Sequence, residues 1–230
     1  MSLQHAEGGA PLSTPRKYAS HSIENRRALI ARAARQLIVE KGPEDFTMAE
    51  ISLKAGVATK TIYNSIGGKS ELIAQAVEHY QDELRDAVRL PANYGLEDVL
   101  SNLAGICGRL VKEPGWGRAI ATLYFGRDYG EEVVSRLRMV SQAHLDPCWD
   151  WLDRQGMLLA NAPRDLILRQ FAGTAYALLS DWSLGRIEDA ALFPSLAFAL
   201  LTTLLAATDP AGHAELMRHA RRVATAGTMS

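Results

Sequence analysis

Five side chains within one short segment could contact nucleic acid: Thr59, Lys60, Thr61, Tyr63 and Asn64. A lysine ammonium group reaches a phosphate or the edge of a guanine, and asparagine pairs with adenine. Threonine hydroxyls contact phosphates or bases, their methyl groups meet thymine, and a tyrosine hydroxyl donates to a phosphate. The segment therefore has the side chains needed to recognise a DNA sequence, provided that they all face outward.

Other chemistry has little support in the sequence. The run Gly67-Gly68-Lys69-Ser70 resembles the end of a phosphate-binding loop, but Tyr63 occupies the position of the first glycine and no strand precedes it. Cys107 and Cys148 form no C-x-x-C pair and are expected to be buried thiols. No catalytic motif occurs. We therefore predict no catalytic residue, no metal site, no cofactor and no enzymatic activity.

Two short helices are expected to position the candidate DNA-contacting side chains. Thr47 and Glu50 form a capping box that begins a helix, and Gly56 ends it. Val57 is expected to anchor the turn, and a second helix follows over residues 59–65. Ile51 and Ile62 are expected to face inward and fix the crossing angle. Two short helices joined by a three-residue turn with a glycine form a helix-turn-helix.

The rest of the chain also predicts helices, and no run of alternating residues predicts a strand, so the fold class is all-α. The first helix is expected to begin at Ser22 and to end at Gly42, before Pro43. Pro147 should kink or split the helix around it near Asp146. The further expected helices cover residues 69–89, 95–112, 116–126, 130–155, 163–184, 190–208 and 211–224.

Residues 47–72, TMAEISLKAGVATKTIYNSIGGKSEL, resemble the signature of the TetR (tetracycline-repressor-like) family. The resemblance covers about residues 22–75. The sequence departs from the family pattern at three places. Ala58 replaces the usual serine cap, so Thr59 is expected to cap the helix one residue later. Lys60 stands where glycine is common, and Ser65-Ile66 replaces a pair that usually contains an aromatic anchor. The matching positions are Ile51, Ala55, Gly56, Val57, Thr61, Ile62, Tyr63, Lys69, Glu71 and Leu72.

The resemblance implies a homodimeric transcriptional regulator, most often a repressor, that binds a palindromic DNA operator and is released by a small-molecule effector. It implies a flexible arm (1–21), a helix-turn-helix domain (22–68) and a helical ligand-binding and dimerisation domain (69–230), with helix 69–89 connecting the two. The expected DNA contacts are Arg26, Arg27, Thr47, Thr59, Lys60, Thr61, Tyr63, Asn64 and Lys69. The residues expected to line a ligand pocket are Trp116, Tyr124, His144, Trp149 and Tyr176.

The segment Ala190–Thr208 carries no charge and is nearly long enough to span a membrane. Its threonines and small alanines favour a helix buried in protein. Because the segment is too apolar for the surface of a monomer, we expect a second copy to cover it, through the helices near 163–184 and 190–208. Close helix approach is expected at Gly173, Ala197, Ala199 and Ala206.

The 230 residues carry a net charge of -1, which excludes a uniformly basic nucleic-acid coat. Residues 16–80 hold 10 basic and 7 acidic residues, so a locally basic module remains. No apolar secretory segment occurs near the N-terminus, and a cytoplasmic protein is expected. Two alternatives stay open: a small-molecule-binding protein with a degenerate DNA-binding module, and a DNA-binding protein that responds to no ligand.

Overall fold

The computed structural model describes residues 15–87, 90–126 and 129–227. Within these ranges the chain is helical, with one isolated bridge between Leu158 and Thr208, so the all-α prediction is confirmed. The helices are α1 (Pro15–Lys41), α2 (Met48–Ala55), α3 (Thr59–Ser65), α4 (Lys69–Ala87), α5 (Leu96–Lys112), α6 (Pro114–Phe125), α7 (Gly130–Arg154), α8 (Arg164–Ser183), α9 (Asp189–Leu204), the 3-10 turn η1 (Leu205–Ala207) and α10 (Pro210–Gly227).

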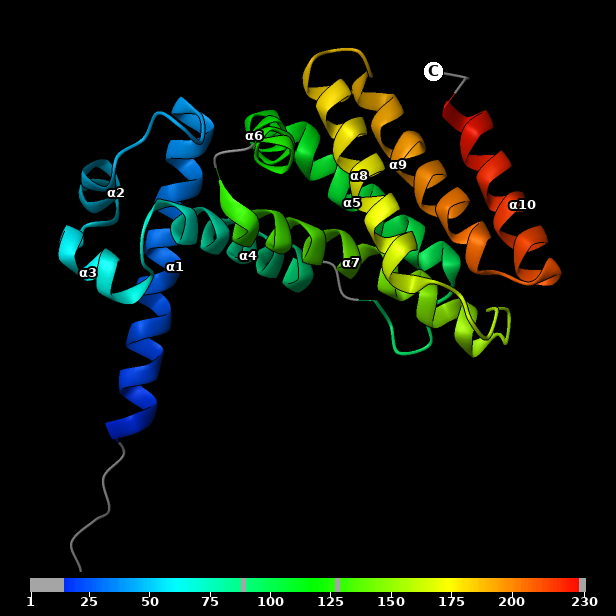
Figure 1. Cartoon of the computed structure of the whole chain (residues 1–230), viewed down its shortest axis with the longest axis horizontal. Coiled ribbons are helices and arrows are strands. Elements are labelled where there is room, and N and C mark those ends of the chain that lie inside the picture. Colours follow the sequence, from blue (N-terminus) through cyan, green and yellow to red (C-terminus); the bar gives the residue numbers. More distant parts are fainter. Residues whose placement is uncertain (1–14, 88–89, 127–128, 228–230) are drawn as a thin grey trace, which may run out of the picture.

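Helices α1, α2 and α3 lie together at one end of the molecule, and α1 extends well beyond the other two (Figure 1). The predicted start of α1 at Ser22 is wrong, because the helix begins at Pro15. Proline suits a first helical turn, and no glycine or proline interrupts residues 16–21. Residues 15–21, predicted as part of a flexible arm, are thus helical, while residues 1–14 lie outside the described part of the chain.

Helix α4 joins this end of the molecule to the body, because it packs against α1 on one side and α7 on the other. Its buried residues include Leu72, Ile73, Val77 and Leu84. The predicted helix to Arg89 is seen as far as Ala87, and residues 88–89 lie outside the described ranges. A shift of α4 would therefore change the packing of both α1 and α7.

Helix α7 runs through Pro147 without interruption, so the predicted split near Asp146 does not occur. A proline inside a helix removes one backbone hydrogen bond. Leu145, Cys148 and Leu152 are fully buried around it and hold both halves of the helix against the body. Tertiary packing thus compensates for the missing backbone bond.

The apolar helix α9 lies between α8 and α10 and also contacts α5 (Figure 1). Eight of its residues are buried within this one chain, Ala197 and Ala199 among them. Helix α10 covers one side of α9, and the expectation that a second copy covers exposed residues such as Phe198 stays a prediction. Its length and composition would suffice to cross a membrane, but the packing agrees with the prediction of a helix buried in protein.

Candidate nucleic-acid interface and internal cavity

The predicted capping box at the start of α2 is present. The Glu50 amide donates to the Thr47 hydroxyl at 3.3 Å, and the Thr47 amide donates to a Glu50 carboxylate oxygen at 2.9 Å. A side-chain hydrogen bond from Lys41, followed by those from Thr47, lowers the pKa of Glu50 to about 2. Glu50 is therefore ionised at neutral pH and ties the end of α1 to the start of α2.

The turn between α2 and α3 has the predicted form. Gly56 ends α2 in the left-handed region, at φ 66°. The Ser52 hydroxyl donates to the Val57 carbonyl at 2.6 Å, and Val57 packs against the core. Ile51 and Ile62 are fully buried, as expected. These contacts fix the angle at which α3 stands on the domain.

Helix α3 begins after Ala58, which makes no side-chain cap, so the prediction that Thr59 caps one residue later is wrong. Lys60, Tyr63 and Asn64 are exposed, and Thr59 and Thr61 are half-buried. At the far end, Ile66 packs against the core, where the TetR signature usually has an aromatic residue. The outward side of α3 therefore presents the polar groups predicted for DNA contact.

Most basic side chains around this domain already have partners inside the protein. Arg32 and Arg35 pair with Glu83 at 3.1 and 2.7 Å, Lys41 pairs with Glu50, and Lys54 pairs with Glu40 at 2.6 Å. Among the described residues, no ion pair is seen for the exposed cations Arg26, Arg27 and Lys60.

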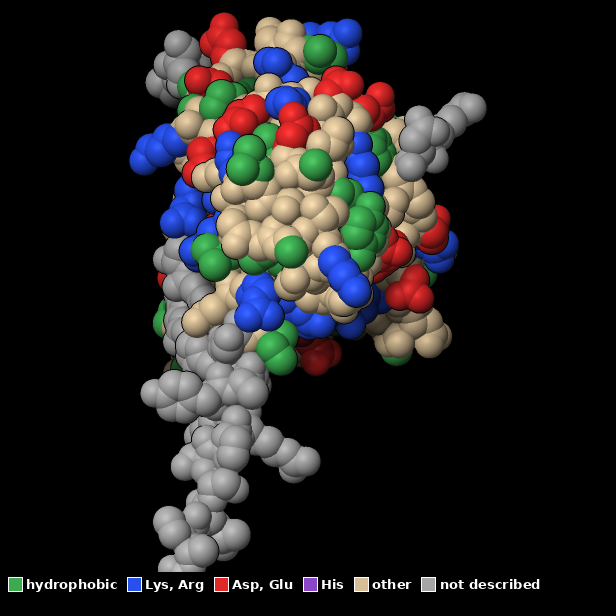
Figure 2. All heavy atoms as spheres, turned by 90° about the vertical axis from the view of Figure 1, so that its left-hand side faces the viewer, with side chains coloured by type: hydrophobic (Ala, Val, Ile, Leu, Met, Phe, Trp, Pro, Cys, Tyr) green, Lys and Arg blue, Asp and Glu red, His purple; other side chains and the backbone are tan. Residues whose placement is uncertain are grey.

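Figure 2 shows this end of the molecule face-on, with lysine and arginine side chains below the centre of the face and also at its top and edges, and acidic ones mainly above the centre and at the lower right. The centre consists largely of backbone and uncharged polar side chains. A basic region beside an uncharged polar surface suits a phosphate backbone beside base edges.

Two residues predicted to hold phosphates also have internal roles. The Lys69 ammonium donates to the carbonyls of Glu44 at 2.5 Å and Phe46 at 3.0 Å, and it lies 4.4 Å from the Phe46 ring centroid. The Thr47 hydroxyl donates to Glu50 at 3.0 Å. An ammonium group has three donors, so Lys69 retains one for an outside acceptor. These two hydrogen bonds within the protein explain why a lysine stands at the start of α4, and they could not be predicted from the sequence.

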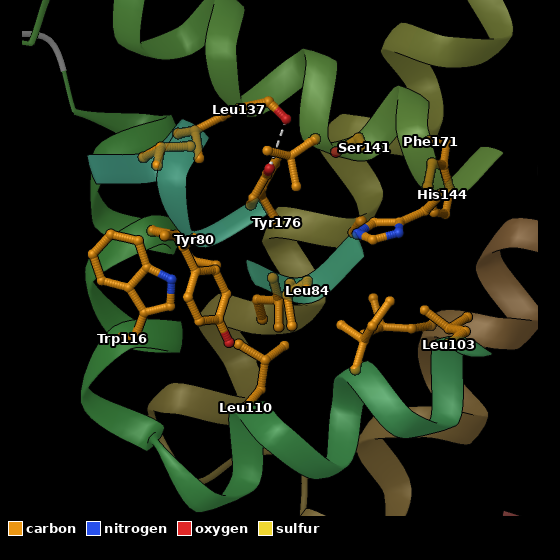
Figure 3. A pocket seen from close by; sticks show the side chains of 17 residues that line it. Tyr80, Leu84, Leu103, Leu110, Trp116, Leu137, Ser141, His144, Phe171 and Tyr176 are labelled. Carbon is orange, nitrogen blue, oxygen red and sulfur yellow. Dashed lines mark hydrogen bonds between the residues drawn. The ribbon is translucent and has the colours of Figure 1, made fainter. Parts of the chain in front are cut away.

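The body contains a cavity of about 70 Å³ that is lined almost entirely by apolar side chains (Figure 3). Residues of α4, α5, α6, α7, α8 and α9 line it, so it lies at the centre of the body. No lysine, arginine, aspartate or glutamate lies among its lining residues. The lining residues with polar atoms are Tyr80, Trp116, Ser141, His144 and Tyr176.

Three of the five predicted pocket residues line this cavity: Trp116, His144 and Tyr176. Tyr124 lies behind it, with its ring stacked on that of Tyr176 at 4.3 Å between centroids. Trp149 lies away from the cavity, 5.5 Å from the guanidinium group of Arg164. The sequence pattern gives no sign that Tyr124 and Trp149, unlike the other three residues, lie outside the cavity wall.

Tyr80 of α4 also lines the cavity, although it is not among the residues predicted to line a pocket. Its ring centroid is 5.4 Å from that of Trp116, and its outer side lies 5.0 Å from the guanidinium group of Arg35 in α1. Arg35 and Arg32 both bind Glu83, one turn along α4 from Tyr80. The cavity wall is therefore in contact with the helix-turn-helix domain through a short series of side chains.

Burial changes the protonation of the groups that face the cavity. It lowers the pKa of His144 to about 4 and raises the pKa of Tyr80 to about 12. The imidazole and the phenol are therefore both neutral near pH 7. Within the described part of the chain, no cluster of His, Cys, Asp and Glu could hold a metal ion.

Comparison with known proteins gives a family match for the N-terminal helices of the chain. Residues 30–76 match the profile described as bacterial regulatory proteins, tetR family. No curated protein sequence matches the chain.

Solved structures of similar fold extend the comparison to most of the chain. A TetR transcriptional regulator from Rhodococcus sp. RHA1 matches with TM-score 0.60 and 19% identity, over 81% of this chain and 98% of its own. A tetR-family regulator from Streptomyces coelicolor matches with TM-score 0.58 and 21% identity, over 88% and 89%. NalD from Pseudomonas aeruginosa matches with TM-score 0.53 and 18% identity, over 81% and 99%. Residues 30–76 thus match the TetR-family profile, and the chain has the all-helical fold of solved structures described as TetR-family transcriptional regulators.

Proposed function

We propose that this protein is a cytoplasmic transcriptional repressor that binds a palindromic DNA operator as a homodimer and leaves it when a small molecule enters the body. The observation that carries the proposal is the outward side of α3, where Lys60, Tyr63 and Asn64 are exposed and the ammonium of Lys60 has no ion pair among the described residues. Two proteins of similar fold, NalD and SmeT, are named as repressors of multidrug efflux pumps.

In the proposed complex, α3 enters the major groove, because its short polar side chains fit base edges there. Lys60, Thr61 and Asn64 contact bases, and Thr59 contacts a phosphate or a base at the groove edge. The remaining contacts go to the phosphate backbone, which fixes the position of the domain on the duplex. These backbone contacts are Arg26, Arg27, Thr47, Tyr63 and Lys69.

The proposed dimer contact lies on the outer side of α8 and the exposed edge of α9. Leu166, Leu184 and Phe198 are exposed there, and an added Cβ at Gly173 would meet no other atom. A glycine inside a helix costs about 1 kcal/mol relative to alanine. Since no neighbour within the chain requires Gly173, close approach of a second α8 supplies a reason for it.

The effector would act by widening the cavity. Val77, Tyr80 and Leu84 of α4 line it, and α4 packs against α1. A ligand that pushes α4 outward changes the separation of the two α3 helices in the dimer, and the operator fits only one separation. An allosteric coupling of about 1–3 kcal/mol would suffice for this effect.

The test is a titration of the DNA upstream of the protein's own gene with the purified protein. Fluorescence anisotropy of the DNA measures binding at two salt concentrations. A scrambled duplex is the control. We expect a preference of about 10³ or more for the upstream DNA. Equal and weak binding to both duplexes, followed by no enriched site in a genome-wide binding selection, would contradict the proposal and favour a degenerate DNA-binding module.

Variants of α3 test which residues contact bases. We expect Lys60→Ala and Asn64→Ala to change the preferred base at one position each, at a cost of about 1–3 kcal/mol for the original base. The matched control is Lys54→Ala on α2, because its ammonium is already paired with Glu40. Identical base preferences in all three variants would place the recognition surface elsewhere.

A further inference from the structure

Two polar groups in the cavity wall have no partner. Among the described residues, neither the Tyr80 hydroxyl nor the Trp116 indole Nε1 has a hydrogen-bond partner, and the two residues are 8% and 0% exposed. Leaving a donor unpaired in the interior is costly, and most buried polar groups are paired. Both residues stand at the same end of the cavity (Figure 3), so a single acceptor between them could serve both donors.

His144 stands apart from this pair, across the cavity (Figure 3). No hydrogen bond is formed by its ring within the described residues. The fourth aromatic polar group, the Tyr176 hydroxyl, differs because it donates to the Leu137 carbonyl at 2.7 Å. The cavity therefore has two donors at one end and an unpaired neutral imidazole at the other, with apolar walls between them.

The walls restrict the charge of any occupant. The lining side chains carry no formal charge, so an ionised ligand would lose its hydration without gaining an opposite charge. They also restrict size, since about 70 Å³ is roughly half of an engineered cavity of ~150 Å³ that binds benzene. A ring-sized ligand must therefore push the walls apart, including α4.

We propose that the cavity binds an uncharged, largely apolar ring compound through a carbonyl-type acceptor, which receives hydrogen bonds from the Tyr80 hydroxyl and the Trp116 indole. The opposite end of the ligand lies against His144, which accepts from a hydroxyl or donates to a second acceptor. This inference rests on the proposed function, because it assigns a chemical class to the effector.

The experiment uses three probes of similar shape with the full-length protein: acetophenone, which has the acceptor; α-methylstyrene, which lacks it; and benzoate, which is an anion. Binding is followed by the indole N–H signals in a heteronuclear NMR titration, since the chain has only four tryptophans. The Trp116 signal is identified by its loss in Trp116→Phe. If that variant does not fold, it is identified by elimination with Trp149→Phe, Trp151→Phe and Trp182→Phe.

We expect acetophenone to bind at least about tenfold more tightly than α-methylstyrene, because only its carbonyl can accept the two hydrogen bonds. It should also shift the Trp116 signal downfield, and benzoate should not bind. In Tyr80→Phe the preference for acetophenone should fall by about threefold or more. The control is Tyr94→Phe, because Tyr94 does not line the cavity and stacks under Arg154 at 4.3 Å.

Equal binding of acetophenone and α-methylstyrene would overturn the proposal, and so would tighter binding of benzoate or no binding of any probe. The titration contains no DNA, so its failure would leave the operator test unaffected. Conversely, a protein that prefers acetophenone but binds no operator would retain the ligand class and lose the proposed repressor function.

Discussion

Tyr80 and Tyr176 both line the cavity, but only one of their hydroxyl groups is satisfied. The Tyr176 hydroxyl binds the Leu137 carbonyl, and the Tyr80 hydroxyl has no partner. We expect Tyr176→Phe to lower the free energy of unfolding by about 1 kcal/mol. Tyr80→Phe should leave it unchanged or raise it by about 1 kcal/mol, because the variant removes a buried unpaired donor. Urea denaturation measures both, and an equal loss in the two variants would contradict the assignment.

Lys69 illustrates a residue with two roles that one experiment can separate. If it contacts a phosphate, Lys69→Ala should make the negative slope of log K against log salt shallower by roughly one for all DNA sequences. The same variant should lose about 1 kcal/mol of stability, because the carbonyls of Glu44 and Phe46 lose their donor. In Lys54→Ala, the control, the salt slope should stay unchanged. A loss of stability without a change of slope would assign Lys69 to the fold alone.

At the scale of elements, the start of α2 depends on an ionised carboxylate. The pKa of Glu50 is lowered from 4.5 to about 2 by its hydrogen bonds to Lys41 and Thr47. A carboxylate whose pKa is lower in the folded state contributes stability above the unfolded pKa and loses it as the pH falls towards the folded one.

We therefore expect Glu50→Gln to lower Tm at pH 7 relative to the unsubstituted protein. The difference should shrink below about pH 4.5 and vanish only below about pH 2, where most Glu50 carboxylates of the folded protein are protonated. Thermal unfolding followed by circular dichroism at a series of pH values measures this. Glu24→Gln on the exposed part of α1 is the control and should show no such trend. A difference that stays constant across the pH range would show that the charge of Glu50 does not matter.

The junction of α1 and α4 is the other element-scale feature that bears on function. Arg32 and Arg35 of α1 both pair with Glu83 of α4, and burial of this carboxylate is outweighed by its two guanidinium partners, which lower its pKa. Arg35 also lies over the ring of Tyr80. The ion pairs that join α1 to α4 therefore lie next to the end of the cavity that contains Tyr80.

At the scale of the whole molecule, the position of the dimer contact follows from which surfaces remain uncovered. Helix α10 covers α9, so α8 and the exposed edge of α9 are left for a partner. Gly173 on α8 and Gly105 on α5 offer a matched pair, because both lie inside helices and an added Cβ would meet no other atom at either position.

We expect Gly173→Leu to weaken the dimer and Gly105→Leu to leave it unchanged. Each substitution should favour its own helix by roughly 0.5–1 kcal/mol, so a loss of folding is not expected. Sedimentation equilibrium over a range of concentrations gives the dissociation constants. A dimer weakened by Gly105→Leu instead would move the contact to α5.

The helix-turn-helix could be predicted from the residues alone, because its contacts join residues close together in the chain. The capping box of Thr47 and Glu50, the turn at Gly56 and the inward-facing Ile51 and Ile62 were all predictable. The outward residues of α3 followed, since a helix that buries Ile62 must expose its other side. The all-α class followed from the same short-range patterns.

The neighbour that covers each buried surface could not be predicted in this way, because the two sides of such a contact lie far apart in the chain. Helix α10 packs along one side of α9, and the Lys69 ammonium donates to the carbonyls of Glu44 and Phe46. Six helices meet around the cavity, and this arrangement placed Tyr80 in its wall and left Trp149 outside. Periodicity shows which side of a helix is buried, but it does not name the neighbour, and the neighbour determines which buried groups remain unpaired.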